Sequence, residues 1–306
     1  MSLSGIRSIT LGVPDVAAVQ KFYEDFGLTA VDPGRLATTE GGEQLTLVHS
    51  DRRRLIEVVF GASDADKVLA ISSRLQRFDV AADSTSEAVA VTDPGTRVRF
   101  VAKVMPPLLQ TPPVPAPTNW PGLTNRVDGR AAVIGREGPV RPRRLGHVVV
   151  GSTDHERSEA LLTQGFGLKV SDIIKNAGAF LRCSTDHHSV LVQTAPVPFV
   201  HHTSWQVDDV DEVGRGATSM LETDPARHAW GLGRHHIGSN FFWYLRDPVG
   251  TFAEYYSDMD VIEDGQAWDP GVFEGIRSIY SWGQPPPPSF LNPEDLAALM
   301  IGAHQK

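Results

Sequence analysis

The spacing of apolar and polar residues repeats along the chain, and this repeat predicts its elements. The sequence IRSITLGVPD at 6–15 is a run of β-branched and apolar residues that ends in an aspartate able to cap a helix. FGL at 26–28 then places a glycine where that helix would stop. LGHVVVGSTD at 145–154 and FGL at 166–168 repeat the design. The chain is therefore expected to consist of two related halves.

Each half also contains the design twice. LIEVVFGASDADKV at 55–68 and VHHTSWQVDDVDEV at 200–213 are again strands followed by acidic residues suited to a helix N-terminus. A hairpin with an Asp-Pro turn follows each of them, at 91–100 and at 244–255. The pattern predicts four units of a strand, a helix and several further strands, two units in each half.

Proline and glycine mark the boundaries between these parts. Residues 105–143 are too rich in both for regular structure, so we expect a linker that drapes over the surface. The chain then divides into an N-terminal domain at 1–104, this linker, a C-terminal domain at 144–262 and a tail at 263–306. The tail contains SWGQPPPPSF, whose four prolines favour a stiff extended segment. We expect the tail to act as a lid.

Charge and composition narrow the function. The 306-residue chain has a formal net charge of −9, which argues against nucleic-acid binding, because such a protein needs a basic face to replace phosphate counterions. No stretch of 18 apolar residues occurs, and the N-terminus lacks the apolar core of a signal peptide, so we expect no membrane contact and a cytoplasmic location. A single cysteine, Cys183, fits a reducing compartment, and its strand-like neighbours predict a buried thiol rather than a nucleophile.

Most residues that could bind a metal or take part in catalysis lie in the second half, where nine of the eleven histidines fall between residues 147 and 236. Aligning the two halves places His147, His202 and Glu254 opposite Ser8, Glu57 and Arg99. The first three residues can bind a metal together, whereas the other three cannot. Two imidazoles and one carboxylate leave several positions open on a six-coordinate ion, as in the non-heme Fe(II) oxygenases. A lone histidine on a strand is more often a hydrogen-bonded core residue, and Glu254 alone could equally be a half-exposed strand glutamate. It is the matching repeat positions that favour a metal site.

Further titratable side chains lie near these positions in the sequence. His201 is expected to face the other side of its strand, so the alignment with Glu57 selects His202 as the ligand. If the hairpin at 244–255 has a three-residue loop, Tyr244 faces Glu254 across it. The pairs at 187–188 and 235–236 could each be surface histidines, and Tyr244 could simply pack its ring.

These motifs, taken in order, resemble a known family. LGHVVV, HHSVLV, HTSWQVDDVDEVG, and GRH followed by a tyrosine nine residues on and a glutamate ten beyond that resemble the type I extradiol ring-cleavage dioxygenases. These enzymes of the vicinal oxygen chelate superfamily open catechols next to the diol. The resemblance covers both domains, including the absence of metal ligands from the first. It implies an α+β fold with two domains, each of paired βαβββ modules.

The resemblance also implies roles for individual residues. His147, His202 and Glu254 would be the metal ligands, for Fe(II) or alternatively Mn(II). His188 would match the histidine that stabilises the bound oxygen species and moves protons. His235 and Tyr244 would match residues that hydrogen-bond the substrate's hydroxyls. The substrates would be a small aromatic diol and O2, and the protein would form a homo-oligomer. His187, His201 and His236 receive no role.

Three other functions remain open from the sequence. A glyoxalase or glutathione-transferase type enzyme would use the same paired fold, but has no need of His188 together with Tyr244. A non-enzymatic drug-binding protein of the bleomycin-resistance type would have no metal triad. A hydroquinone-cleaving relative would keep the triad and accept a para-diol. The substituent on the ring is not defined by the sequence.

Overall fold

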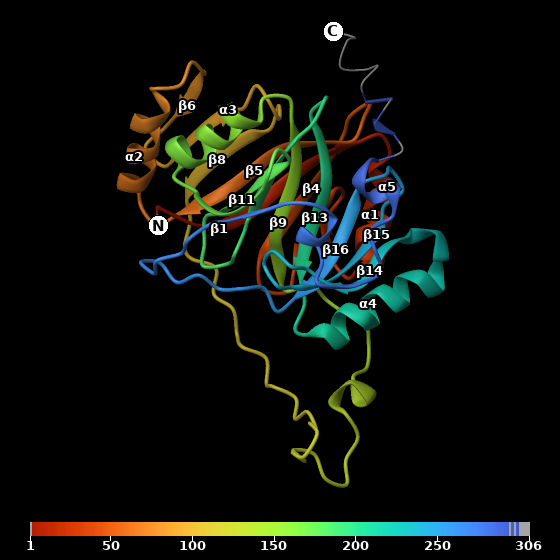
Figure 1. Cartoon of the computed structure of the whole chain (residues 1–306). Coiled ribbons are helices and arrows are strands. Elements are labelled where there is room, and N and C mark those ends of the chain that lie inside the picture. The colour runs from red at the N-terminus through yellow and green to blue at the C-terminus, as the bar shows by residue number, and fades with distance from the viewer. Residues whose placement is uncertain (1, 294, 297, 300–306) are drawn as a thin grey trace.

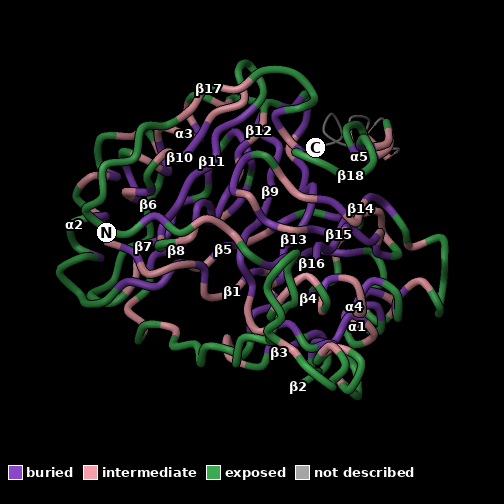
Figure 2. The backbone as a smooth tube through the Cα atoms, turned by 60° about the horizontal axis from the view of Figure 1, so that its bottom comes forward, coloured by how far each residue is buried: buried purple, intermediate pink, exposed green. Residues whose placement is uncertain are grey.

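The computed structural model describes residues 2–293, 295–296 and 298–299. The end of the predicted lid, from residue 300 onward, lies outside the described residues. Each half of the chain forms one mixed β-sheet with helices packed against it (Figure 1). Buried strands occupy the middle of both sheets, and exposed connections surround them (Figure 2).

The first half follows the order βαβββ twice. Its elements are β1 (Leu3–Val13), α1 (Val16–Asp25), β2 (Thr29–Asp32), β3 (Arg35–Thr38), β4 (Gly42–His49), β5 (Arg54–Ala62), α2 (Ala65–Leu75), β6 (Ala82–Ser84), β7 (Ala88–Thr92) and β8 (Arg99–Val104). The sheet order is β2-β3-β4-β1-β5-β8-β7-β6. The first strands of the two units, β1 and β5, pair antiparallel and hold the units together at the centre of the sheet.

The second half repeats this order and adds the tail. Its elements are β9 (Arg144–Ser152), α3 (His155–Ala160), a π-helical turn (Leu161–Phe166), β10 (Lys169–Ile174), β11 (Gly178–Arg182), β12 (Val190–Thr194), β13 (Phe199–Gln206), α4 (Val210–Thr223), β14 (His228–Arg234), β15 (Phe241–Arg246), β16 (Phe252–Ser257), β17 (Gly271–Phe273), β18 (Trp282–Gly283) and α5 (Pro288–Leu291). The sheet order is β17-β10-β11-β12-β9-β13-β16-β15-β14-β18, so the tail adds a short strand at each edge. The predicted α+β class and the paired βαβββ modules are confirmed.

The capping pattern read from the sequence appears in all four units. The side chains of four aspartates accept a hydrogen bond from the backbone N–H three residues on and start α1, α2, α3 and α4: Asp15, Asp64, Asp154 and Asp209. Gly27 and Gly167 follow the first helix of each half in a left-handed conformation, with φ of 98° and 88°. The same local chemistry therefore starts and stops equivalent helices in both halves.

Helices of each half also pack against the sheet of the other. Phe26, just after α1, stacks on Tyr255 of β16 with ring centroids 3.7 Å apart. In the reciprocal contact, Phe166 packs against Phe60 and Phe100 of the first sheet. One continuous cluster of buried apolar side chains joins the two halves. The folding of the two halves is therefore coupled, because they share this apolar core.

The linker departs from the expectation. Residues 112–135, called the arm from here on, extend away from the body instead of draping over it (Figure 1). Asn119 holds the arm's own backbone by bonds to the N–H groups of Asn125 and Arg126, and Trp120 pairs with Leu123. Asn125 and Arg126 also bond to carbonyls within the arm, and its prolines favour an extended backbone.

Within the described residues, none of the helices combines the length and the apolar character needed to cross a membrane.

Candidate metal centre and substrate cavity

Three neighbouring strands at the centre of the second sheet bring the predicted ligands together. His147 lies on β9, His202 on β13 and Glu254 on β16, and these strands are adjacent in the sheet. Ser204 of β13 is in register with His147 on one side and Glu254 on the other. The alternation of side chains along a strand then places His202, two residues from Ser204, on the same face as both.

The geometry of the cluster fits a metal ion. Nε2 of His147 lies 3.0 Å and Nε2 of His202 lies 3.7 Å from Oε2 of Glu254. One ligand atom from each residue lies within 4.8 Å of the other two. Nε2 of His202 and Oε2 of Glu254 are buried and have no hydrogen-bond partner among the described residues. Buried polar atoms without partners are costly, and a bound cation would satisfy both.

Glu254 is held as a carboxylate although its side chain is fully buried. Burial alone would raise the pKa of this carboxyl, but the imidazoles of His147, His235 and His202 outweigh burial and hold the pKa well below its usual value. The amide of Asn240 donates to Oε1 at 3.2 Å, which leaves Oε2 to face the two candidate ligands. The cluster therefore presents a negative charge and two imidazoles to the same point.

The expectation that His201 faces away from His202 is wrong. The pairing of β13 with β9 has an irregularity between Val200 and His202, so His201 is the extra residue of a β-bulge. Both histidines consequently border the cavity. His201 Nε2 donates to the carbonyl of Phe290 at 2.7 Å, and its Nδ1 lies 2.8 Å from Nδ1 of His202.

This contact defines which nitrogen of His202 is free. Burial lowers the pKa of His201 to about 4, although the bond to Phe290 opposes this, so His201 is neutral at pH 7. Because its Nε2 carries the proton given to the carbonyl, its Nδ1 must accept from Nδ1–H of His202. The lone pair of His202 is then on Nε2, which faces Glu254. This is the tautomer that a metal ligand requires.

The other three predicted residues border the same cavity. The ring of His188 lies 4.2 Å from that of His147, centroid to centroid, and burial followed by the nearby His147 lowers its pKa. Tyr244 faces Glu254 across the β15–β16 hairpin, as the three-residue loop predicts. The hydroxyl of Tyr244 lies 2.8 Å from Nε2 of His235.

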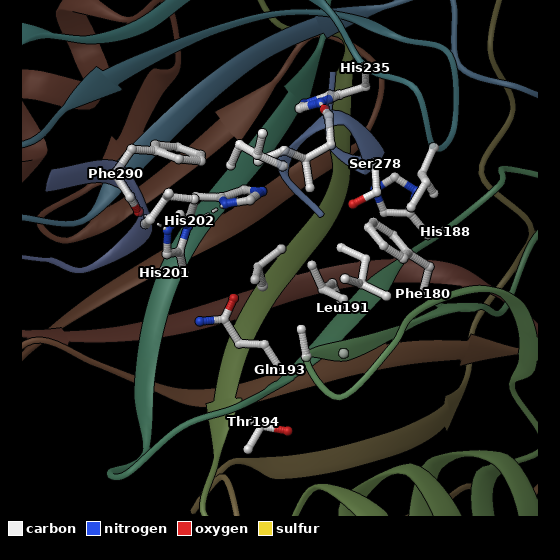
Figure 3. A pocket seen from close by; sticks show the side chains of 18 of the residues that line it. Phe180, His188, Leu191, Gln193, Thr194, His201, His202, His235, Ser278 and Phe290 are labelled. Carbon is white, nitrogen blue, oxygen red and sulfur yellow. Dashed lines mark hydrogen bonds between the residues drawn. The ribbon is translucent and has the colours of Figure 1, made fainter. Parts of the chain in front are cut away.

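The cavity beside this cluster has a volume of about 560 Å³. Figure 3 shows His188, His202, His235 and Phe290 around one end of it, and Gln193 and Thr194 toward the other. Apolar side chains form much of the wall between them: Val149, Ile174, Phe180, Leu191, Ile237, Ile279 and Leu291. Such a site suits an aromatic ring with polar contacts at one end.

The first half supports the ligand strands from the opposite face. Thr203 and Tyr255 directly follow two of the candidate ligands and therefore point the other way. The hydroxyl of Tyr23 in α1 lies 2.9 Å from Oγ1 of Thr203, and Tyr255 donates to the carbonyl of Phe26 at 2.7 Å. The unit without metal ligands thus forms the backing of the site.

The structure corrects one detail of the superposition of the two halves. The turn of the first hairpin is one residue longer than that of the second, so Arg99 corresponds to Phe252 in register. The true counterpart of Glu254 is Val101. The first half still lacks a set of metal ligands, since a valine cannot bind a metal.

Some residues of the site were missed by the sequence reasoning. Asn240 lies in a loop and gives no local signal, and Phe290 belongs to a tail with no counterpart in the repeat. The role of His201 was hidden because a bulge cannot be read from side-chain alternation. The available signal in the sequence was the adjacency of the histidines at 187–188 and at 201–202, because in each pair the two imidazoles contact each other.

Comparison with known proteins identifies the family. Residues 144–255 match the model of the Glyoxalase/Bleomycin resistance protein/Dioxygenase superfamily. The chain is 31% identical to Metapyrocatechase 2 of Cupriavidus necator over 300 residues, which cover 95% of this chain and 92% of the relative. The chain belongs to the extradiol ring-cleavage dioxygenases. The family expected from the motifs is confirmed.

Two further matches agree with this extradiol dioxygenase family. The manganese-dependent 2,3-dihydroxybiphenyl 1,2-dioxygenase of Geobacillus genomosp. 3 is 29% identical over 140 residues, covering 43% of this chain and 44% of that protein. The solved homoprotocatechuate 2,3-dioxygenase of Arthrobacter globiformis shares the fold, with a TM-score of 0.75 at 19% identity, over 95% of this chain and 91% of that one. Relatives named in the family depend on iron or on manganese. These matches do not favour the glyoxalase-like or drug-binding alternatives.

Proposed function

We propose that this extradiol dioxygenase opens the ring of a catechol-type diol beside its two hydroxyl groups, with O2 as the second substrate. The observation that carries the proposal is the His147–His202–Glu254 cluster beside an apolar cavity. In this cluster Nε2 of His202 and Oε2 of Glu254 are buried and lack hydrogen-bond partners among the described residues. The remaining polar groups at that end are suited to moving protons to and from a bound diol.

His147, His202 and Glu254 would hold the metal, which we propose is Fe(II), with Mn(II) as the alternative that the same ligands suit. When bound, such an ion supplies Lewis acidity toward the two diol oxygens and an open position for dioxygen. The protein's part is to fix the ligand atoms. Asn240 orients the carboxylate, and His201 fixes the tautomer of His202.

His235 and Tyr244 would form the hydrogen bonds that hold the hydroxyls of the diol. Nδ1 of His235 donates to the carbonyl of Ile279, so Nε2 must accept from the hydroxyl of Tyr244. The phenolic oxygen then keeps its lone pairs for a substrate hydroxyl. Burial and the neighbouring Glu254 raise the pKa of Tyr244, so it remains protonated and orients the ring through hydrogen bonds.

His188 would transfer protons in the steps of the reaction that involve O2. It reaches the cavity from the loop before β12, whereas His235 lies in the connection after β14 and Tyr244 lies on β15. A histidine here can take a proton from the diol and return it to the departing oxygen. Its burial keeps water away from this transfer.

The cavity favours an uncharged substituent on the ring. Apart from histidines, Lys175 is the only basic side chain among the described residues that line it, and Lys175 pairs with Glu274. A carboxylate substituent would therefore enter without a free cation to receive it. We propose a catechol with an apolar group that extends toward Gln193.

The tail would cover the cavity, with residues 144–262 as the catalytic domain and 263–306 as its lid. The ring of Phe290 lies 4.6 Å from that of Tyr244, and Arg53 of the first half binds the carboxylate of Asp295 through two nitrogens. These contacts support a lid role for the tail, since Phe290 borders the cavity beside His202. The cover would keep the reacting groups dry.

We propose that the protein forms a homo-oligomer in which the arm contacts a second copy of the chain. Its largely exposed apolar side chains are Val114, Trp120, Leu123, Val127 and Ile134. The arm itself carries Arg126, Arg130 and Asp128, a net charge of +1, whereas the whole chain has a net charge of −9. An apolar arm with a small positive charge is complementary to the acidic body of a neighbouring copy.

We also propose a cytoplasmic location. Cys183 is a buried free thiol, and burial raises its pKa to about 12, so it is inert and needs no oxidising compartment.

The decisive experiment loads the protein with Fe(II) without oxygen and then adds a panel of diols in air. Yellow ring-fission product with one O2 consumed per diol is the expected result, and the best substrate in the panel should carry an apolar substituent. Oxygen uptake with para-diols alone would indicate a hydroquinone-cleaving enzyme. Bound metal with no oxygen consumed by any diol would overturn the proposal.

A further inference from the structure

A histidine and a carboxylate stand behind His188, and the proposed function uses neither. His187 is fully buried in the loop between β11 and β12. Its Nε2 lies 2.9 Å from Oδ2 of Asp172 on β10, and its Nδ1 lies 3.1 Å from Nδ1 of His188. The three side chains form a chain that leads from the cavity to β10, the strand next to the edge of the sheet.

The chemistry of each atom fixes the protons in this chain. The Asp172 carboxylate can only accept, and its Oδ1 already accepts from the N–H of Gly271 at 2.7 Å. Nε2 of neutral His187 must therefore donate to Oδ2. Its Nδ1 then has no proton and accepts from Nδ1–H of His188. The Nε2 of His188 is left with a lone pair, and no group among the described residues hydrogen-bonds it.

We propose that Asp172, His187 and His188 form a proton relay that serves the extradiol reaction. When His188 takes a proton from a diol hydroxyl at Nε2, it releases its other proton from Nδ1 to Nδ1 of His187. His188 stays neutral and becomes a donor at Nε2, while the positive charge rests on His187 beside the Asp172 carboxylate. The reverse sequence returns the proton to oxygen. No other reactant is required, and each proton that enters is matched by one that leaves.

The surroundings keep these rings in place. The backbone N–H of His187 donates to the carbonyl of Asp260 at 2.9 Å, and Trp268 lies edge-on to its ring at 5.7 Å. Gly238 has a φ of 83°, and a Cβ there would lie 3.4 Å from Nδ1 of both histidines. A glycine at this position therefore lets the chain close over the paired rings without crowding them.

The proposal rests on the proposed role of His188 and is tested by removing the relay behind it. In His187→Asn, the shorter amide can still accept from Nδ1–H of His188 but cannot carry a proton. Asp172→Asn removes the charge that would stabilise protonated His187. Both variants should reduce kcat about 10- to 100-fold, while metal content and the anaerobic Kd for the diol change less than about twofold. His49→Asn, at an exposed histidine of the first half, is the matched control.

A double-mutant cycle separates a relay from a purely structural role. In a His188→Phe background, His187→Asn should cost less than about twofold more in kcat, because the relay has already lost its first member. A kcat of His187→Asn near that of the wild type, a fully additive loss in the cycle, or loss of bound metal in both variants would overturn the relay. If His188→Phe itself left kcat unchanged, the proposed role of His188 would fail instead, which distinguishes the two.

Discussion

Glu254 keeps a negative charge where burial alone would neutralise it, and this makes it the most sensitive position in the cluster. Glu254→Gln preserves the shape of the side chain and removes the charge. We expect metal affinity to fall about 100-fold or more while the melting temperature of the metal-free protein changes little. Metal content after equilibration with Fe(II), measured by elemental analysis, checks this. Glu222→Gln, at an exposed position of α4, is the control. Full occupancy of Glu254→Gln would remove this residue from the ligand set.

Asn240 acts through Glu254 and should show a weaker effect. In Asn240→Ala, Oε1 of Glu254 loses its 3.2 Å donor, so the carboxylate is free to turn away from His147. We expect a decrease of about 10- to 100-fold in metal affinity with a smaller change in kcat at saturating metal. A competition titration with a metal chelator measures the affinity. An affinity equal to that of the wild type would show that packing alone orients Glu254.

At the scale of residues, repeat symmetry had real predictive power. It aligned His147 with Ser8 and His202 with Glu57, and those two assignments depend only on strand spacing. It failed where the backbone leaves the ideal pattern: the different lengths of the two hairpin turns hid that Glu254 corresponds to Val101 and not to Arg99, and a bulge turned His201 toward the cavity. Bulges and turn lengths depend on tertiary packing, which one sequence does not display.

At the scale of elements, the β15–β16 hairpin carries a pH-sensitive group. Burial raises the pKa of Asp247 to about 7, against the N–H donors of Thr251 and Val249. A carboxyl with a higher pKa in the folded than in the unfolded chain binds its proton more tightly when folded. Its contribution to stability is therefore greatest below about pH 4 and is lost as the pH rises through about 7.

Asp247→Asn keeps a neutral side chain that can still accept from the turn. We expect its melting temperature to exceed that of the wild type by a few degrees at pH 8, and the difference to shrink toward zero near pH 4. Thermal unfolding of both metal-free proteins across this range measures it. A constant difference at all pH values would contradict the assignment of this titration to Asp247.

The tail is the second element with a definite expectation. In Phe290→Ala, the ring that packs against Tyr244 and Phe252 is lost, and the cavity opens beside His202. We expect KM for the diol to rise about tenfold, which corresponds to the loss of part of one buried aromatic contact. Steady-state kinetics at saturating oxygen measures it, with Val272→Ala at an exposed tail position as the control. An unchanged KM would show that the tail does not cover the substrate.

At the scale of the whole molecule, the arm makes a prediction about assembly. Replacing both Trp120 and Leu123 by serine should convert the protein to a monomer, because the exposed apolar contacts at the end of the arm would be lost. Light scattering coupled to size-exclusion chromatography gives the mass. Leu69→Ser, at an exposed leucine of α2, should leave the assembly intact. A wild-type protein that is already monomeric would contradict the proposed role of the arm.

The overall architecture was predictable because local signals agree with one another. Asp caps and strand alternation recur in all four units, and glycine stops recur in the first unit of each half; together they determine the order βαβββ. The direction of the arm and the packing of α1 on the opposite sheet were not predictable. The packing of α1 depends on contacts between residues more than a hundred positions apart, such as Phe26 with Tyr255.

The contact between Phe26 and Tyr255 matters for any attempt to produce the second half as a separate catalyst. Residues 144–262 contain the six proposed site residues and resemble a self-contained module when read as sequence. Their ligand strands, however, rest on Tyr23 and Phe26 from the first half. Without that backing, Thr203 and Tyr255 would face water, and the two strands that carry His202 and Glu254 would lose their alignment. The first half thus supports the structure of the second, so the two halves have to be kept together in evolution and in protein engineering.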